Sequence, residues 1–319
     1  MKIVFLETNP LGDDVDLTPF DQLGEVIKYP STSPSENAGR IGDADVVVVN
    51  RIPMNEETLR YANNLKLICN TGTGTNMINF DYTNSRKITV ANVKGYSTQS
   101  VVQHTFALLF FLYDKLSYYD NFVKSGEYSR SDIFNQSDVK FHELYGKTWG
   151  IIGLGDIGKG VAEIAKMFGC RVIYYSTSGE NRNSDYRQVD LDTLLKESDI
   201  ISIHAPLNDN TRDLIKEEQL LKMKKSAVLL NLGRGPIVNE NALMKALKED
   251  WIAAAGLDVL TVEPMLPGNP LGEIKDSSKL VITPHIAWAA VESRQRVTEE
   301  VYMNIAAFFQ GEERNIVRQ

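Results

Sequence analysis

Cysteine and histidine are both scarce in this chain, which limits the chemistry available to it. The 319 residues include only two cysteines, Cys69 and Cys170, and four histidines. The cysteines lie at the end of one apolar run and just before another, as expected of small buried side chains. Because cysteines are so few, we expect a protein of the reducing cytoplasm without a disulfide framework. The histidines lack the spacing of metal ligands, so we expect no metal site: His104, His142, His204 and His285.

A basic excess and a long apolar run are also missing. Lys and Arg number 34 against 42 Asp and Glu, giving a net charge of −8, and no stretch concentrates the basic residues. A nucleic-acid surface is therefore not expected. The longest apolar stretch, 106–113, is too short to span a bilayer. Residues 1–6 carry one positive charge and are followed by acidic residues, which predicts a first strand rather than a signal peptide.

Short apolar runs separated by helical patterns make up most of the chain. Such runs indicate parallel sheets buried on both faces, and the length favours two domains. Four runs precede a helical pattern over about 98–116: 2–6, 45–49, 65–69 and 88–91. Six follow it, as many as a complete doubly wound nucleotide domain contains: 149–152, 171–175, 200–203, 227–230, 253–257 and 280–282. A last helical pattern covers 291–309, with one apolar face formed by Val297, Val301, Ile305 and Phe308.

A glycine-rich turn follows the run 149–152. Gly153 would permit a tight turn, Gly155 would let backbone approach a pyrophosphate, and Gly158 would let the next helix pack on the strand. Asp156 and Ile157 would begin that helix, whose N-terminus favours anions. The motif predicts a dinucleotide site, with a purely structural turn as the alternative. Because nearly half the chain precedes it, another domain is expected to be built first.

Reactive side chains follow three later runs. Arg234 comes after 227–231, Asp258 closes 253–257 with Glu263 five residues on, and His285 follows 280–284. Ligands of open α/β sheets gather beyond the carboxyl ends of strands, so these groups are expected on one edge. Each alone would suit a surface or loop position. Their coincidence favours a site.

These residue types suit hydride transfer between a nicotinamide and a 2-oxo acid. The planar guanidinium of Arg234 would bind carboxylate and carbonyl oxygens. His285 would protonate the oxygen as hydride reaches carbon. A buried carboxylate such as Glu263 would hold the ring and stabilise the imidazolium. Asp258 would accept a hydrogen bond from the nicotinamide carboxamide.

The chain resembles the D-isomer-specific 2-hydroxyacid dehydrogenase family over essentially its whole length, through the segments 153–158, 231–235, 256–259 with 263–264, and 284–287. The resemblance implies an α/β fold of two doubly wound parallel-sheet domains. A Rossmann dinucleotide-binding domain, 98–289, would be inserted in a flavodoxin-like substrate domain, 1–97 completed by 290–319.

The resemblance also implies residue roles. Arg234, Glu263 and His285 would be the catalytic trio, and the backbone N–H groups of Thr73 and Gly74 would bind the substrate carboxylate together with Arg234 and His285. The nicotinamide cofactor would meet the residues of the glycine turn and those of several other loops and one helix: Thr105, Ser176, Thr177, Ala205, Pro206, Leu232, Gly233 and Asp258.

Cofactor preference stays open at this stage. NAD-specific members carry Asp at the end of the second nucleotide strand, but here the strand 171–175 runs into Ser176, Thr177 and Ser178. Loss of the acid removes the repulsion that excludes a 2′-phosphate, and Ser176, Thr177 and Arg182 would bind one. NAD is slightly favoured over NADP because no Arg immediately follows the strand.

The segments 92–96 and 284–288 resemble glycerate dehydrogenase and hydroxypyruvate reductase members. They imply reduction of hydroxypyruvate or glyoxylate to D-glycerate or glycolate. The alternative is a D-lactate dehydrogenase, or a D-2-hydroxyacid dehydrogenase of the branched-chain type, and an inactive nucleotide-sensing, corepressor-like protein is a remote one. Trp288 would either narrow the substrate pocket or pack beneath it.

The aromatic segment 112–134 predicts an interface. Its aromatic side chains exceed what a monomer surface usually exposes: Tyr113, Tyr118, Tyr119, Phe122 and Phe134. The resemblance implies a two-fold homodimer formed through the nucleotide domains.

Overall fold

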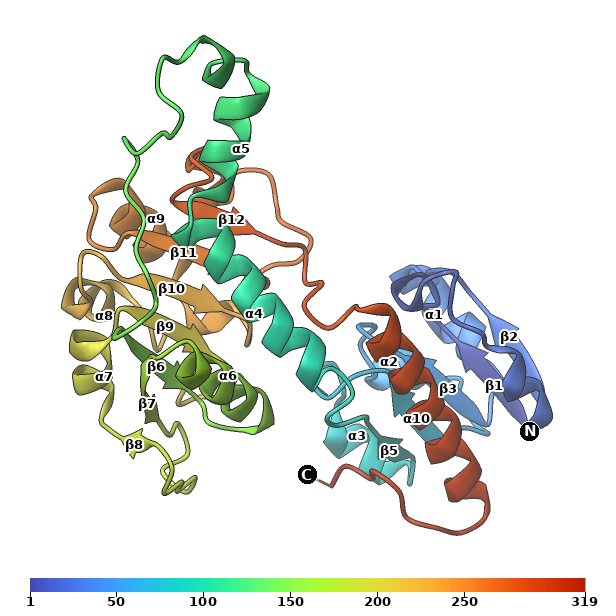
Figure 1. Ribbon diagram of the computed structural model, residues 1–319. Helices are drawn as coiled ribbons and strands as arrows, with labels where there is room; N and C mark the ends of the chain where they lie inside the picture. Colours follow the sequence, from blue (N-terminus) through green and yellow to red (C-terminus); the bar gives the residue numbers. More distant parts are fainter. Residues whose placement is uncertain (319) are drawn as a thin grey trace. The chain divides into compact units, whose positions relative to one another are not determined.

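The structure, a computed structural model, describes residues 1–318, and these form two compact units (Figure 1). One unit contains Met1–Ser97 and the segment that begins at Trp288; the other is Thr98–Ala287. The second division lies between Ala287 and Trp288, two residues before the expected one. Each unit is an α/β layer structure around its own parallel sheet, as the fold-class prediction requires.

The first unit contains a five-stranded parallel sheet of order β2-β1-β3-β4-β5, the flavodoxin-like order. The strands are β1 Lys2–Phe5, β2 Glu25–Lys28, β3 Val46–Val49, β4 Leu67–Asn70 and β5 Thr89–Ala91. The four predicted runs all form strands. The remaining strand, β2, was not predicted, because it is an edge strand with only Val26 and Ile27 as apolar residues.

Helices cover both faces of this sheet: α1 Pro34–Ile41, α2 Glu56–Leu59, α3 Phe80–Ser85 and α10 Val291–Phe309, with 3₁₀ turns at Asn9–Leu11 and Thr18–Gln22. Helix α10 belongs to the last part of the chain but packs on this first sheet. Its buried Val297, Val301 and Ile305 share one core with Phe5 and Phe20. The predicted apolar face of the last helix is therefore the face that closes the first unit.

The second unit contains a seven-stranded parallel sheet of order β12-β11-β10-β9-β6-β7-β8. The six predicted runs form β6 Thr148–Ile152, β7 Arg171–Tyr175, β9 Ile200–Ile203, β10 Val228–Asn231, β11 Ala254–Leu257 and β12 Leu280–Ile282. The seventh, β8 Arg187–Gln188, is a polar edge pair with no apolar signal. Strand β6 pairs with both β7 and β9, so the strand order reverses at β6, where a doubly wound sheet binds its ligand.

The helices of this unit are α4 Thr98–Tyr113, α5 Leu116–Lys124, α6 Asp156–Met167, α7 Leu191–Glu197, α8 Glu217–Lys222 and α9 Glu240–Lys248, with 3₁₀ turns at Tyr128–Arg130, Gly235–Ile237 and Pro270–Glu273. Helix α4 packs on α6, β10 and β11, and Leu108, Leu109 and Leu112 are buried there. Among residues 1–318, no helix is both long and apolar enough to cross a membrane.

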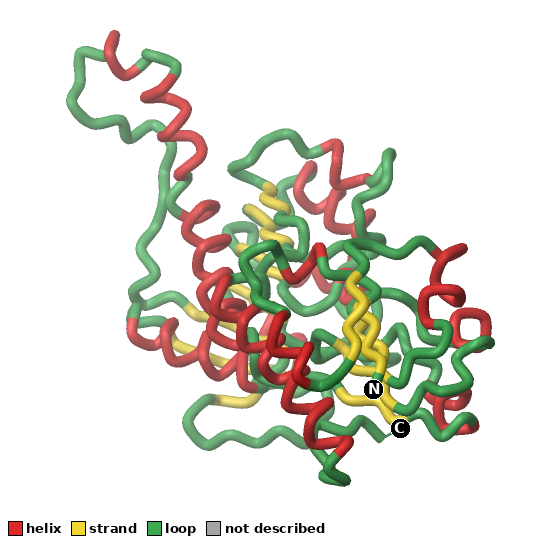
Figure 2. Tube along the Cα trace, turned by 90° about the vertical axis from the view of Figure 1, so that its right-hand side faces the viewer, coloured by secondary structure: helices red, strands yellow, loops and turns green. Residues whose placement is uncertain are grey.

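Helix α5 and the segment after it extend away from the body of this unit in both views (Figures 1 and 2). Phe134 on this projection is 88% exposed. Tyr118, Tyr119 and Phe122 are partly exposed and pack on one another. The expectation that Tyr113 is exposed was wrong: it closes α4 and is buried in the core that contains Trp149, because α4 packs along its length on the sheet.

Candidate active site

The glycine turn after β6 has the geometry that a bound pyrophosphate needs. Gly153 has φ of +92°, and a Cβ there would lie 2.9 Å from the backbone nitrogen of Ala205. A Cβ on Gly158 would lie 2.3 Å from the carbonyl oxygen of Gly153, so α6 packs on the turn only with glycine at that position. Around Gly155, by contrast, a Cβ would meet no described atom within 4 Å. The N-terminus of α6, at Asp156 and Ile157, therefore has open space before it.

An imidazole–carboxylate pair lies beyond the carboxyl ends of β11 and β12. Nδ1 of His285 and Oε2 of Glu263 are 2.8 Å apart, and the other oxygen of Glu263 accepts the backbone N–H of Leu260 at 2.8 Å. The carboxylate is held from both sides, so it can fix the orientation of the ring through Nδ1. Glu263 was expected to be buried but its side chain is 20% exposed, because it sits in the loop after β11 rather than under the sheet.

The turn that carries His285 is held by Asp258. This carboxylate is 2% exposed. One oxygen accepts the Thr283 hydroxyl at 2.6 Å and the Ile286 N–H at 2.9 Å, and the other accepts the Ala287 N–H at 2.9 Å. The backbone oxygen of Asp258 accepts the N–H of His285 at 2.8 Å. His285 itself has φ of +55°, a left-handed conformation that is uncommon for residues other than glycine.

This use of Asp258 was not predicted. Three of the roughly four hydrogen bonds that a carboxylate accepts are made within the chain. One remains for the expected nicotinamide carboxamide, and that contact stays a prediction.

His104 on α4 extends the network. Its Nε2 is 3.0 Å from the Thr283 hydroxyl oxygen and 3.7 Å from Asp258. Because the single hydroxyl proton of Thr283 is donated to Asp258, the oxygen accepts from His104, which fixes the proton on Nε2. The neighbouring Thr105 is fully buried and donates its hydroxyl to Val101 at 2.8 Å. Its expected contact with the cofactor stays a prediction.

Arg234 lies at the carboxyl end of β10, beside the strand that leads to Asp258 and Glu263. The side chain of Asn231 builds its turn, accepting the N–H of Gly233 at 3.1 Å and donating to the carbonyl of Arg234 at 3.0 Å. The turn packs closely on the loop after β11, since a Cβ on Gly235 would lie 2.0 Å from the carbonyl of Leu260. Strands β10, β11 and β12 are neighbours, so the predicted catalytic trio follows three adjacent strands on one edge.

The loops expected to face the cofactor are largely packed on one another. Leu232 and Ala205 are buried, and a Cβ on Gly233 would lie 2.8 Å from the carbonyl of Ala205. Pro206 is exposed. Burial lowers the pKa of His204, at the end of β9, to about 3. Its ring nitrogens have no hydrogen-bond partner within residues 1–318.

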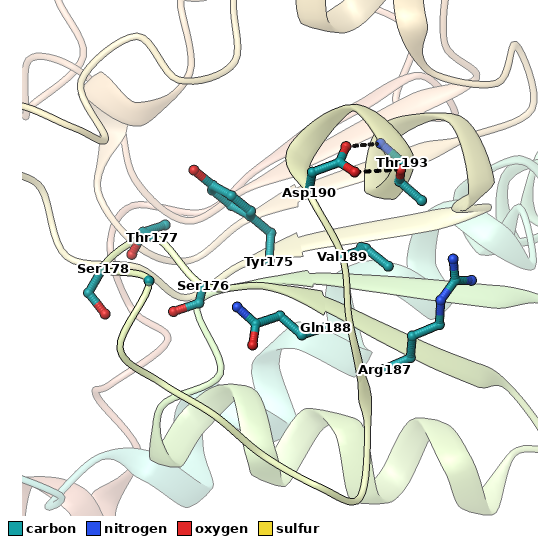
Figure 3. Close-up of a pocket in the computed structure, with 10 residues that line it drawn as sticks. Tyr175, Ser176, Thr177, Ser178, Arg187, Gln188, Val189, Asp190 and Thr193 are labelled. Carbon is teal, nitrogen blue, oxygen red and sulfur yellow. Dashed lines mark hydrogen bonds between the residues drawn. The ribbon is translucent and has the colours of Figure 1, made fainter.

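A cavity of about 650 Å³ lies beside the end of β7 (Figure 3). Ser176, Thr177 and Ser178 contribute hydroxyls to its wall. The hydroxyl of Ser176 is buried and has no partner among the described residues. The acidic side chain of the lining, Asp190, caps α7 by accepting the N–H and hydroxyl of Thr193, both at 2.8 Å. Position 176 itself carries a hydroxyl and no acid.

Arg187 and Gln188 also line this cavity, and sequence reasoning missed both because β8 has no apolar pattern. Arg187 pairs with Glu197 at 3.1 Å. Arg182, which was expected to bind a 2′-phosphate, is exposed and is not among the residues that line the cavity.

In the first unit, Thr73 and Gly74 lie in the loop after β4. The carbonyls of Gly72, Thr73 and Gly74 are all hydrogen-bonded to side-chain amides. Within residues 1–318 the N–H groups of these three residues meet no backbone acceptor. Successive amides of this kind form a concave anion site. Trp288 packs edge to face on Tyr96 with ring centres 6.2 Å apart, which favours packing over narrowing of a pocket.

Comparison with known sequences gives a consistent result. A family model described as "D-isomer specific 2-hydroxyacid dehydrogenase, NAD binding domain" matches residues 106–287. The chain is 36% identical over 317 residues to a glycerate dehydrogenase of Methylorubrum extorquens, covering 99% of this chain and 98% of the relative. It is also 36% identical over 325 residues to a hydroxypyruvate reductase of Blautia hydrogenotrophica, covering 100% of each.

Solved structures with a similar fold include enzymes with either nicotinamide cofactor. A D-lactate dehydrogenase from Lactobacillus jensenii, solved with NAD⁺, has a TM-score of 0.81 at 28% identity, with 100% of both chains covered. An acyclic imino acid reductase in complex with NADPH and D-Arg has a TM-score of 0.87 at 30% identity, also with 100% of both chains covered.

Proposed function

The chain belongs to the D-isomer specific 2-hydroxyacid dehydrogenase family, and on that premise we propose that it reduces hydroxypyruvate or glyoxylate to the corresponding 2-hydroxy acid with a nicotinamide cofactor. The observation that carries the proposal is the pair of His285 and Glu263, 2.8 Å apart on the edge of the sheet where the dinucleotide turn opens. The names of the two relatives with 36% identity support the substrate class.

The residues present fit a dinucleotide, because the open space at Gly155 and the N-terminus of α6 suit a pyrophosphate. A nicotinamide held there would supply the hydride for the substrate carbon. His285 donates the proton from Nε2 to the carbonyl oxygen, so that a 2-oxo acid, a hydride and a proton become a 2-hydroxy acid. Glu263 stabilises the imidazolium until that transfer, and Arg234 binds the carboxylate and carbonyl oxygens. For the first unit by itself, the proposal is that the amides of Thr73 and Gly74 bind a substrate carboxylate.

Activity as a D-lactate dehydrogenase, or on branched 2-oxo acids, is the second candidate, and it is favoured by the fold shared with the Lactobacillus jensenii enzyme. A nucleotide-sensing protein without activity would not need the imidazole, carboxylate and guanidinium together. One experiment distinguishes the main proposal from the second candidate and from the nucleotide-sensing protein. The purified protein is assayed with NADH and NADPH against hydroxypyruvate, glyoxylate, pyruvate and branched 2-oxo acids, and kcat/KM is compared.

The highest kcat/KM with hydroxypyruvate or glyoxylate supports the proposal. A clear preference for pyruvate or for a branched acid replaces it with the second candidate. Cofactor binding without turnover of any 2-oxo acid refutes the main proposal and the second candidate, and leaves the nucleotide-sensing protein.

We further propose a homodimer formed through the projection of α5 and the segment that follows it. Support comes from its exposed apolar side chains, among them Ile133, Phe134 and Phe141. Sedimentation at micromolar concentration should then give about twice the chain mass of 35.7 kDa; an active monomer contradicts the proposal. The two cysteines are free and buried, which supports a reducing compartment such as the cytoplasm.

A further inference from the structure

The loop that follows β4 is held in an unusual way: side-chain amides bind its carbonyls one after another. Nδ2 of Asn70 donates to the carbonyls of Gly72 at 3.0 Å and Gly74 at 2.6 Å. Nδ2 of Asn92 donates to the carbonyl of Thr73 at 2.7 Å. Asn70 and Asn92 are 1% and 3% exposed, so these three carbonyls all face the protein interior.

Orientation of the carbonyls fixes orientation of the amides. A trans peptide is planar, and its C=O and N–H point in opposite directions. Binding of the Gly72 carbonyl from inside therefore turns the N–H of Thr73 outward, and binding of the Thr73 carbonyl does the same for the N–H of Gly74. Thr73 is exposed, and Gly72 and Gly74 are partly exposed. Asn92 thus sets the direction of one of the two amides proposed to bind the substrate carboxylate.

Asn92 is in turn held by residues from the far end of the chain. Its backbone N–H donates to the carbonyl of Asn315 at 3.2 Å, and its carbonyl accepts from Nδ2 of Asn304, on α10, at 3.0 Å. The two distant residues are linked as well, since Nδ2 of Asn315 donates to Oδ1 of Asn304 at 2.9 Å. Asn304 is 2% exposed, so this is a buried network.

The segment around Asn315 is anchored on both sides. Nδ2 of Asn315 also donates to Glu300 at 3.2 Å, and Arg314 pairs with the same carboxylate oxygen at 2.6 Å. Ile316 forms an antiparallel bridge with Ala91, one residue before Asn92. The last of residues 1–318 therefore form an added edge beside β5, at the place where Asn92 leaves the strand.

We propose that Asn92 is a positioning residue for the carboxylate-binding loop, and that Asn304 and Asn315 connect the C-terminal segment to that loop. The inference rests on the proposed function, because it takes the ligand of the loop to be the carboxylate of a 2-oxo acid. None of the three asparagines needs to touch the substrate. Their effect is to preorganise the amides of Thr73 and Gly74, which lowers the cost of ordering the loop on binding.

The test compares Asn92→Ala and Asn315→Gly with the wild-type enzyme. Glycine is used at 315 because Asn315 has φ of +54°, which alanine would strain and glycine accepts. Three quantities are measured: KM and kcat for the 2-oxo acid, the Kd of NADH by fluorescence, and the Kd of oxamate by calorimetry on the NADH-loaded enzyme. Oxamate carries the carboxylate of a 2-oxo acid but no ketone that can be reduced.

Loss of one orienting hydrogen bond should raise KM and the oxamate Kd about 3- to 10-fold in Asn92→Ala, the range that a net hydrogen bond contributes. The change should be about 2- to 3-fold in Asn315→Gly, which acts through one more link. In both variants kcat and the Kd of NADH should stay within twofold, because uniform substrate binding is what is lost.

Asn37 gives a matched control. It lies in the same unit, is 1% exposed, and makes no side-chain hydrogen bond within residues 1–318. Asn37→Ala removes an equally buried amide without touching the loop, so KM and the oxamate Kd should not change. If it raises them as Asn92→Ala does, the effect is general loosening of the unit and the positioning role is wrong.

Failure of the inference differs from failure of the proposed function. A wild-type enzyme that turns over 2-oxo acids, with Asn92→Ala and Asn315→Gly unchanged in KM and oxamate Kd, refutes the positioning role alone. A wild-type protein that neither turns over a 2-oxo acid nor binds oxamate refutes both. If Asn92→Ala does not fold, the outcome with Asn315→Gly decides, because that side chain is partly exposed and its removal leaves the core intact.

Discussion

Replacement of Glu263 by Gln tests the proposed acid–base pair with a change of one atom. In the structure one carboxylate oxygen accepts the N–H of Leu260 and the other faces Nδ1 of His285, each at 2.8 Å. Glutamine has one acceptor oxygen and one donor NH₂ at these places. If its oxygen keeps Leu260, its NH₂ meets Nδ1 and opposes a proton there. If the side-chain amide is flipped instead, its NH₂ group faces the backbone N–H of Leu260, and two donors then oppose each other.

Either arrangement disfavours the imidazolium form of His285, which carries protons on both nitrogens. A hydrogen bond to a charged partner contributes about 1.5–3 kcal/mol. That loss moves the pH at which reduction falls to half its maximum downward by about one to two pH units. At pH values above the half-maximum of the wild-type profile, the reduction rate should therefore be about 10- to 100-fold lower in the variant. The shift is downward because reduction needs the protonated ring, and a less stable imidazolium loses its proton at lower pH.

The assay is NADH oxidation followed by absorbance from pH 5 to pH 9 with a saturating 2-oxo acid. Glu240→Gln is the control, because Glu240 also holds the loop after β11, through the N–H of Thr261 and the side chain of Asn269, but does not touch His285. Its pH profile should match the wild type. A wild-type profile in Glu263→Gln would refute the reasoning and leave Glu263 with a structural role only.

Three further results are expected. Arg234→Lys keeps the charge but loses the planar pair of donors, so kcat/KM should fall about 100-fold or more for every 2-oxo acid tested; a defect with one acid only would make Arg234 a specificity residue. Ser176→Asp should raise the NADH/NADPH ratio of kcat/KM by repelling a 2′-phosphate, and an unaltered ratio would place the ribose elsewhere. In His204→Asn, the free energy of unfolding should decline less than in the wild type as pH falls below 6.5. The unfolded His gains its proton near pH 6.5 and the buried one only near pH 3, so wild-type stability declines as pH falls through that window, by about 2 kcal/mol at pH 5; a wild-type slope in the variant contradicts this.

Short-range rules explain why the glycine turn and the edge residues were predictable. Gly153 and Gly158 are required by contacts within a few residues or with the adjoining strand, which leave no room for a Cβ. Arg234 and His285 were placed on one edge because consecutive parallel strands end on the same side of a sheet. The first inference uses a local glycine pattern and the second uses the order of the runs along the chain, and the sequence states both directly.

Interactions between distant residues could not be read in the same way. The bonds from Asp258 to Ile286 and Ala287 span nearly thirty residues and depend on the turn after β12. The asparagine network joins residue 92 to residues 304 and 315, and asparagine carries no periodic signal that would pair them. Tyr113 was misplaced because an aromatic residue at a helix end has the same pattern whether the helix packs inward or projects.

The division of the first unit between two parts of the chain has a consequence for synthesis. Residues 1–97 leave the ribosome first, yet the face that α10 covers has nothing to pack against until roughly 200 more residues are made, about 10–40 s at ordinary elongation rates. Residues 98–287 are contiguous and complete their sheet earlier. A released chain truncated after residue 287 should therefore show a protease-resistant second unit and a sensitive first one. During that interval Phe5, Phe20 and the strands beneath them present an apolar surface that is a target for chaperones rather than a finished domain.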